Sequence, residues 1–116
     1  MTAQLQTAIE RGDVFWVDLE PVRGSEIAKI RPCVILSTNE INRRRRTVVI
    51  VPLTSTPEPV AFPLVVAVPS AGAQSKARTE QLRNVDKTRL QRRIGRLSSS
   101  DLADVSRGVA RVLGLT

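Results

Sequence analysis

The sequence predicts a small, mainly β protein, a closed or nearly closed β-barrel of short strands with one C-terminal α-helix. Three observations support this class. Six short apolar or alternating runs, separated by turn residues, precede residue 98. The last part of the chain instead repeats apolar side chains at helical spacing. At 116 residues, the chain has the length of one domain, predicted over 1–116, with a single core.

The N-terminal third predicts an arm, a strand, a loop and a second strand. Residues 1–11 are polar and predict a short loose arm or a partial helical turn. Residues 13–20 alternate in polarity and predict a strand that Pro21 stops. Residues 22–31 have the mixed polarity of a mobile connecting loop. The run 32–37, PCVILS, is rich in β-branched residues and short enough for a buried strand.

The middle of the chain predicts two strands among turns. Residues 38–46 predict a turn, and 47–55, TVVIVPLTS, predict a strand. The segment 56–63 holds three prolines, which cannot donate to a ladder, so it predicts a loop or a sheet edge. Residues 64–68 predict a further strand, followed by a turn region at 69–77.

Two more polar strands and the helix complete the chain. Residues 78–86 and 89–97 are the strand candidates, and 98–114 predict the helix. Ser98 can cap the helix with Asp101 at the third helical position, close to the capping-box pattern. The apolar stripe that would pack on the barrel consists of Leu102, Val105, Val109, Val112 and Leu113.

The charge balance predicts a polyanionic partner. Lys and Arg number 18 against 11 Asp and Glu, a formal net charge of +7. Most of these cations are arginines, whose planar fork suits phosphate better than an ammonium does. Nucleic acid or an acidic protein segment fits this charge, and an arginine-rich bias of the encoding genome is the alternative.

The residues that are missing exclude several kinds of chemistry. The chain has no histidine and a single cysteine, Cys33, so intrachain disulfides, Cys/His zinc sites and His-based nucleophilic dyads are excluded. Cys33 lies in an apolar run and is predicted to be an inert core thiol. No membrane span or signal peptide is visible, so the protein is expected in the cytoplasm.

Arginines gather in two places. The run Arg43–Arg46 at the predicted turn can bind phosphates or belong to a solvated loop, and the sequence leaves both open. A second set is not expected to form one surface, because neighbouring residues of a strand point to opposite faces. This set is Arg89, Arg92, Arg93 and Arg96.

One pairing predicts a site. Arg31 opens one predicted strand, and Thr54 and Ser55 close the next. If the two strands are hairpin neighbours, these residues lie at the same end of the sheet. A guanidinium beside a hydroxyl suits a phosphodiester, and an arginine bonded to loop carbonyls is the structural alternative.

Five blocks of the chain resemble, in order and spacing, the motifs of the MazF/PemK family of toxins from type II toxin–antitoxin modules. The blocks are RGDVFWVDLEPVRGSE, RPCVILS, VVIVPLTS, EQLRNVDKTRL and IGRLSSSDLADV, and the match runs from about Arg11 to Leu115. The resemblance implies an SH3-like barrel of the CcdB/PemK type. It also implies a homodimeric, sequence-selective endoribonuclease that cleaves single-stranded messenger RNA without a metal or cofactor.

The resemblance also assigns residues and a partner. It implies that Arg31 and Thr54 are catalytic, leaving 2′,3′-cyclic phosphate and 5′-hydroxyl ends. Residues expected to bind substrate are Ser55 beside Thr54 and, by match to the family, Glu26, Glu80 and Gln81. The implied partner is an acidic, partly disordered antitoxin of the MazE kind that covers the RNA groove. The family pattern SEQAGKRP is altered here by Ile27 and Lys29, so the RNA sequence preference does not carry over.

Two other functions remain open. A gyrase-poisoning toxin of the CcdB type shares the barrel, but such toxins end in a Trp-Gly-Ile type tail and this chain ends VLGLT. A non-catalytic RNA-binding barrel would bind RNA without cutting it. The three aromatic residues are few for a stacking platform.

Overall fold

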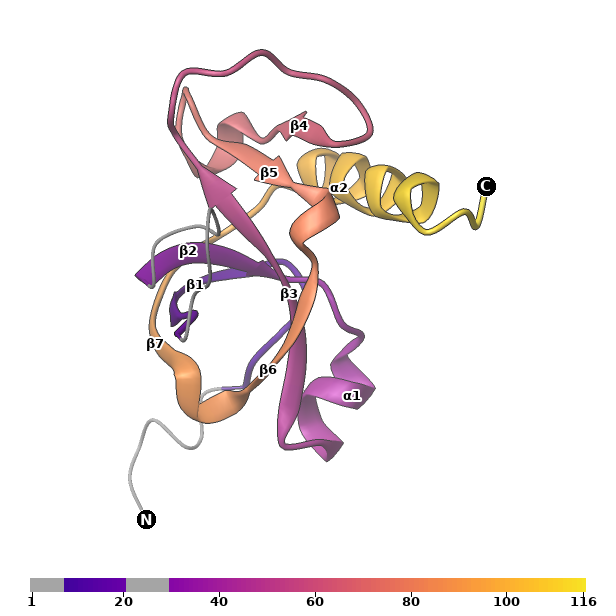
Figure 1. The fold of residues 1–116 in the computed structure, drawn as a ribbon. Helices are drawn as coiled ribbons and strands as arrows, with labels where there is room; N and C mark the ends of the chain where they lie inside the picture. The colour runs from indigo at the N-terminus through magenta and orange to yellow at the C-terminus, as the bar shows by residue number, and fades with distance from the viewer. Residues whose placement is uncertain (1–7, 21–29) are drawn as a thin grey trace.

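The computed structural model describes residues 8–20 and 30–116, and within them shows an antiparallel sheet with two α-helices (Figure 1). The strands are β1 (Asp13–Asp18), β2 (Ile30–Ile35), β3 (Thr47–Thr54), β4 (Val65–Ala67), β5 (Lys76–Arg78), β6 (Arg83–Asp86) and β7 (Leu90–Arg96). The helices are α1 (Asn39–Arg44) and α2 (Ser99–Val112), with single 3₁₀ turns η2 (Pro69–Ala71), η3 (Thr79–Gln81) and η4 (Lys87–Arg89). The prediction of a mainly β fold with a C-terminal helix is confirmed.

The sheet curls without closing into a barrel. Its order is β4-β5-β3-β2-β1-β7, and β6 pairs with the first half of β3. In the described ranges no pairing joins β6 to β7, because η4 carries the chain from one edge of the sheet to the other. The sheet therefore stays open between β6 and β7, where the sequence predicted a closed or nearly closed barrel. Strand β3 is its central member, since β2 lies along one side while β6 and then β5 lie along the other.

Two apolar clusters stabilise the sheet, one on each side of β2. Val34 points to the side that α2 covers, whereas Cys33 and Ile35 point into the curl of the sheet. This double burial explains why PCVILS is a continuous apolar run rather than an alternating one. The cluster under α2 includes Val14, Val51, Leu53, Val66, Val105 and Val109. The cluster inside the curl includes Phe15, Val17, Val48, Ile50 and Val85.

The prediction of a turn at 38–46 is wrong in part, because α1 occupies most of this segment. Thr38 caps the helix, accepting a hydrogen bond from the backbone N–H of Ile41 at 3.5 Å. Glu40 lies in the first turn and basic residues in the last, as the helix dipole favours. The helix is too short for the apolar periodicity that sequence analysis depends on.

Two further boundaries differ from the prediction. The predicted turn 69–77 contains η2 and ends in β5, and the predicted strand 78–86 is interrupted by η3 before β6. Strand β5 has three residues, and it is a strand because it pairs with both β3 and β4. Such tertiary pairing is not visible in a short polar sequence.

The predicted C-terminal helix is confirmed, including its cap. The hydroxyl of Ser98 accepts the backbone N–H of Asp101 at 3.1 Å. Gly108, in the middle of α2, is required by packing. A Cβ atom at this position would lie 2.9 Å from the carbonyl oxygen of Pro63. The helix therefore approaches the loop before β4 more closely than any residue with a side chain allows.

The predicted N-terminal arm lies mostly outside the described residues, which begin at residue 8. Its last residue, Arg11, is held by the fold. The Arg11 backbone N–H donates to Asn39 Oδ1 at 2.7 Å, and its guanidinium donates to Ser106 Oγ at 2.6 Å. Across residues 8–20 and 30–116, neither helix has the length and apolar character needed to span a membrane.

Candidate active site

The register of β2 and β3 places Arg31 across from Thr54. The last pair of this antiparallel ladder is Cys33 and Pro52. If the same register is extended by two residues, Arg31 faces Thr54 on the same side of the sheet. The ladder does not continue that far. Beyond Pro52, β3 pairs with β5, whereas β2 continues along β1, so the two strands separate. Their separation opens a cleft at this end of the sheet.

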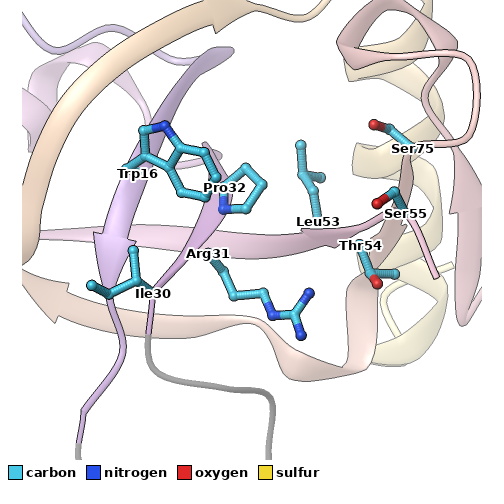
Figure 2. A pocket seen from close by; sticks show the side chains of 8 residues that line it. All are labelled: Trp16, Ile30, Arg31, Pro32, Leu53, Thr54, Ser55 and Ser75. Atoms are coloured by element: carbon cyan, nitrogen blue, oxygen red, sulfur yellow. The ribbon is translucent and has the colours of Figure 1, made fainter.

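The cleft has a volume of about 240 Å³ and is lined by apolar and hydroxyl side chains (Figure 2). Three strands and two loops contribute, because β1, β2 and β3 meet the start of the loop after β3 and the segment that precedes β5 here. The lining residues are Trp16, Ile30, Arg31, Pro32, Leu53, Thr54, Ser55 and Ser75. Of the described residues that line the cleft, Arg31 alone is charged.

Arg31 projects into the cleft, and none of the described carboxylates pairs with it. It is half-buried, and Val17 of β1 is its cross-strand neighbour. Its Nε atom is buried and has no hydrogen-bond partner, and no ion pair holds its guanidinium in the described part of the chain. Figure 2 shows the guanidinium extending in the direction of Thr54. A partly desolvated cation of this kind is stabilised when an anion enters the cleft.

Thr54 is nearly fully buried and its hydroxyl is oriented by the turn that follows β3. Only 4% of the residue is exposed. Its Oγ1 accepts the backbone N–H of Thr56 at 3.2 Å and lies 3.0 Å from Thr56 Oγ1. The turn thus anchors the Thr54 Oγ1 atom in the wall of the cleft.

A buried lysine lies behind Thr54. Lys76 is the cross-strand partner of Thr54 in β5 and is only 6% exposed. Its ammonium donates to the carbonyl oxygen of Gln74 at 2.7 Å, which directs it along the backbone next to Ser75 in the cleft wall. Buried lysines are rare, and this one places a second cation next in sequence to Ser75 of the cleft wall.

The loop after β3 is fixed to the sheet by an ion pair. Arg78 Nη2 of β5 lies 2.6 Å from Glu58 Oε1, and both side chains are less than one-third exposed. This contact holds the Pro-rich loop 55–63 against β5. The loop carries Ser55 and Thr56, so its position affects the geometry around the Thr54 hydroxyl.

The structure brings together three of the residues predicted for the site, Arg31, Thr54 and Ser55. Glu80 and Gln81 lie in η3 and do not line the cleft; Glu80 is exposed and Gln81 is half-buried. Glu26 lies outside the described residues, as do Ile27 and Lys29.

Sequence analysis did not assign Trp16 and Ser75 to the site. Trp16 is half-buried and pairs with Pro32 in the β1–β2 register, so its indole lines the cleft beside Arg31. A flat aromatic side chain at this place is suited to stacking on a nucleotide base. The lone tryptophan of the chain could have been singled out from the sequence as a candidate for base stacking. Its place in the cleft, however, follows only from the pairing of β1 with β2.

Three of the four arginines in the second predicted basic set are held by acceptors within the fold. Arg93 Nε lies 3.1 Å and Arg96 Nη2 lies 3.0 Å from Asp13 Oδ1, so both cations are bound by one buried carboxylate. Arg89 donates to the backbone carbonyl of Asp18 at 3.1 Å. These guanidinium groups are used by the fold.

Cys33 is buried, as predicted, and takes no part in the cleft lining. Burial raises the pKa of its thiol to about 12, against the smaller opposing effects of Arg83 and Arg31. The thiol is therefore neutral and unreactive at physiological pH. The described residues also contain no group of three or more His, Cys, Asp or Glu side chains placed to hold a metal ion.

Comparison with known proteins identifies relatives of this chain. A family model described as a PemK-like, MazF-like toxin of type II toxin–antitoxin systems matches residues 10–113. Endoribonuclease MazF9 of Mycobacterium tuberculosis is 35% identical, over 92% of this chain and 98% of its own length.

Solved structures agree with this relationship. An endoribonuclease from a mycobacterial species superposes with a TM-score of 0.76 at 27% identity, covering 93% of both chains. An endoribonuclease in complex with its cognate antitoxin, also mycobacterial, gives the same TM-score and identity over 92% of this chain and 96% of its own. The resemblance noted in the sequence is therefore confirmed.

Proposed function

We infer that this chain, which belongs to the PemK-like, MazF-like toxin family of type II toxin–antitoxin systems, cleaves RNA in the cleft between Arg31 and Thr54. The observation that carries the proposal is the guanidinium of Arg31. It enters a cleft of about 240 Å³ that the Thr54 hydroxyl also lines, and no carboxylate of the described residues pairs with it.

The proposed reaction uses the nucleophile that RNA supplies. The 2′-oxygen loses its proton and bonds to the adjacent phosphorus, while the bond from phosphorus to the 5′-oxygen breaks and that oxygen gains a proton. The products are a 2′,3′-cyclic phosphate and a 5′-hydroxyl, so the reaction consumes neither water nor a metal-bound nucleophile. The enzyme must align the 2′-oxygen with the departing oxygen and stabilise the charge that grows on the phosphoryl oxygens.

Arg31 stabilises this charge in the proposed mechanism. Its forked N–H groups can contact two phosphoryl oxygens at once, and the apolar walls of the cleft strengthen this attraction by excluding water. Lys76 adds to the positive potential from behind Thr54. A guanidinium keeps its proton in proteins, so the role assigned to Arg31 is charge stabilisation.

Thr54 and Trp16 position the substrate. The Thr54 hydroxyl, fixed by Thr56, is placed to hydrogen-bond a phosphoryl oxygen or the 2′-hydroxyl, with Ser55 assisting. Trp16 offers its indole face to a base next to the scissile bond. Glu26, Glu80 and Gln81 are proposed to contact RNA outside the cleft lining, as the family resemblance implies.

The proposed biological setting follows from the family. The substrate is single-stranded messenger RNA in the cytoplasm, and the active form is a homodimer. An acidic antitoxin is proposed to cover the RNA-binding surface, as a mycobacterial relative forms a complex with its cognate antitoxin. The net charge of +7 favours rapid association with such a partner.

Incubation of the purified protein with a long RNA in excess EDTA tests the proposal. Cut sites are mapped by primer extension, and end groups by their resistance to phosphatase and ligase. We expect cleavage at a short recurring sequence, with 2′,3′-cyclic phosphate and 5′-hydroxyl ends. RNA that is bound but left intact would favour a non-catalytic barrel, and cleavage only after metal addition would overturn the proposed chemistry.

A further inference from the structure

The run Arg43–Arg46 lies at the end of β3 that is farthest from the cleft. It spans the last turn of α1 and the connection into β3, whereas Thr54 ends the same strand. Figure 1 shows α1 beside the start of β3, away from β4 and β5. At about 3.3 Å per residue, the seven steps from Thr47 to Thr54 separate the two ends by roughly 23 Å.

A second segment adds charge at this end. The backbone N–H of Lys87 donates to the carbonyl oxygen of Arg46 at 2.8 Å, which holds η4 against the arginine run. We call these five residues, Arg43, Arg44, Arg45, Arg46 and Lys87, the arginine-rich end. The four arginines are exposed and Lys87 is half-exposed.

Acidic neighbours neutralise only part of this charge. Glu40 pairs with Arg44, with 3.7 Å between Oε2 and Nε, and both side chains are mostly exposed. Asp86 is the other carboxylate at this end. Two hydrogen bonds from Thr88 lower its pKa first, and the nearby charges of Arg46 and Arg89 lower it further. Among the described residues at this end, five cations thus face two carboxylates.

Contacts within the described residues account for only some of these cations. Basic residues in the last turn of α1 complement the helix dipole, which accounts for Arg43 and Arg44. Arg45 and Arg46 follow the helix, and neither forms an ion pair with any residue in the described ranges. Adjacent like charges repel one another, and an external anion would relieve that repulsion.

We propose that the arginine-rich end is a second RNA-binding surface, which holds phosphates of the RNA strand outside the segment that occupies the cleft. The inference rests on the proposed function, because it assigns the same substrate to a separate site. Four of the five cations are arginines, whose forks bind phosphate oxygens in pairs. An acidic peptide that folds on binding would need apolar contacts, and at this end the exposed large apolar residue is Ile41 alone among those described.

The surface gives the enzyme a preference for long strands. An RNA that reaches both sites is held at two places, so the second contact raises the effective concentration of the strand at the cleft. A short oligonucleotide that fills only the cleft gains nothing. The difference between short and long substrates is therefore the signature of this surface.

A charge-removal variant tests the proposal. Arg43→Gln/Arg45→Gln/Arg46→Gln removes three charges and leaves the Arg44–Glu40 pair in place. The matched control, Arg92→Gln/Arg107→Gln/Arg111→Gln, removes three exposed arginines of β7 and α2. Each protein is given a short RNA spanning one mapped cut site and a long single-stranded RNA containing that site. Binding is measured with 2′-deoxy versions of both, and melting temperature reports folding.

We expect the test variant to cleave the short RNA like the unmodified protein and to lose its tighter binding of the long RNA. The plot of log K against log salt for the long RNA has a negative slope, and its magnitude should decrease by about 2. Each lost contact with a single strand removes roughly 0.7 from that magnitude. The control should keep the slope within experimental error. The single variants Arg45→Gln and Arg46→Gln should each lower the magnitude of the slope by about 0.7.

Three results would overturn the inference. Equal slopes for the test and control variants would mean that only net charge matters. If cleavage and binding fell equally for the short and the long RNA, the arginines would act at the cleft or stabilise the fold rather than form a second surface. Weaker binding of an acidic antitoxin, with unchanged RNA binding, would make this end a protein surface. If the unmodified protein cuts no RNA, the proposed function fails, and binding of a short and a long single-stranded RNA chosen without a cut site still tests the surface.

Discussion

Arg31 of β2 and the pair Arg93 and Arg96 of β7 lie on strands that flank β1, yet their guanidinium groups have opposite surroundings. Arg93 and Arg96 share the buried carboxylate of Asp13 at 3.1 and 3.0 Å, and Arg96 also bonds Glu10. Arg31 has a buried Nε without a partner and borders an open cleft. Arg93 and Arg96 are paired with carboxylates of the fold, whereas no carboxylate of residues 8–20 and 30–116 pairs with Arg31.

This difference separates structural from functional arginines in a chain that is rich in them. Charge alone does not distinguish them, because all three side chains are cations on β-strands. What distinguishes them is whether a carboxylate of the described residues pairs with the guanidinium. We therefore expect changes at Arg31 to affect the reaction and changes around Asp13 to affect stability.

The largest expected effect is that of Arg31→Ala on cleavage. Loss of one charge-stabilising donor should lower the single-turnover rate by about a hundred- to a thousand-fold. Arg31→Lys keeps the charge but lacks the fork and should recover only part of this rate. The melting temperature should stay near that of the unmodified protein, since no ion pair of the described residues is lost. Near-normal cleavage by Arg31→Ala would remove Arg31 from the mechanism.

Asp13→Ala should have the next largest effect, on stability rather than on cleavage. Asp13 is 1% exposed, accepts the backbone N–H of Glu10 at 2.9 Å, and forms ion pairs with Arg93 and Arg96 of β7. Hydrogen bonds to charged groups contribute about 1.5–3 kcal/mol, so the free energy of unfolding in urea should fall by about that amount. Cleavage per folded molecule should be unchanged. A folded but inactive Asp13→Ala protein would contradict the separation between the two regions.

Thr54 provides a smaller test at the cleft. Thr54→Val keeps the shape of the side chain and removes the hydroxyl, which should slow cleavage about tenfold, the equivalent of about 1.4 kcal/mol. Thr54→Ser restores the hydroxyl and should recover most of the rate. Equal rates for the valine and serine variants would show that the hydroxyl has no part in positioning the substrate.

Cys33 should show the smallest effect, although it lies two residues from Arg31. Its pKa is raised to about 12, so below that value the folded thiol stays neutral and should resist alkylation at pH 8. In urea the thiol returns to its ordinary pKa and should react within minutes. Cys33→Ala is the unreactive control. Rapid labelling of the folded protein would show that solvent reaches this strand from the cleft side.

Much of the fold was predictable because its signals are local. The buried run of β2, the alternation of β1 and the capped helix α2 each follow from side chains within a few residues. Helix α1 and strand β5 were missed because each is short and depends on contacts with distant parts of the chain. The open edge between β6 and β7 likewise depends on where η4 directs the chain, which no periodicity records.

The site was predictable to the extent that it follows from strand order. Arg31, Thr54 and Ser55 meet because β2 and β3 are antiparallel neighbours, which the turn between two apolar runs implies. Trp16 and Ser75 come from β1 and from the segment before β5, whose registers are set by tertiary pairing. The family resemblance supplied roles for residues, whereas the separation of β2 from β3 that creates the cleft required the structure.

A single substituted RNA tests the central claim most directly. Once a cut site is mapped, two oligonucleotides are compared in EDTA, one all-ribose and one with a 2′-deoxy residue on the 5′ side of the scissile phosphate. We predict that the first is cut to a 2′,3′-cyclic phosphate and that the second is bound equally well and left intact. Cleavage of the 2′-deoxy oligonucleotide at the same bond would contradict the account, because the nucleophile would then come from elsewhere.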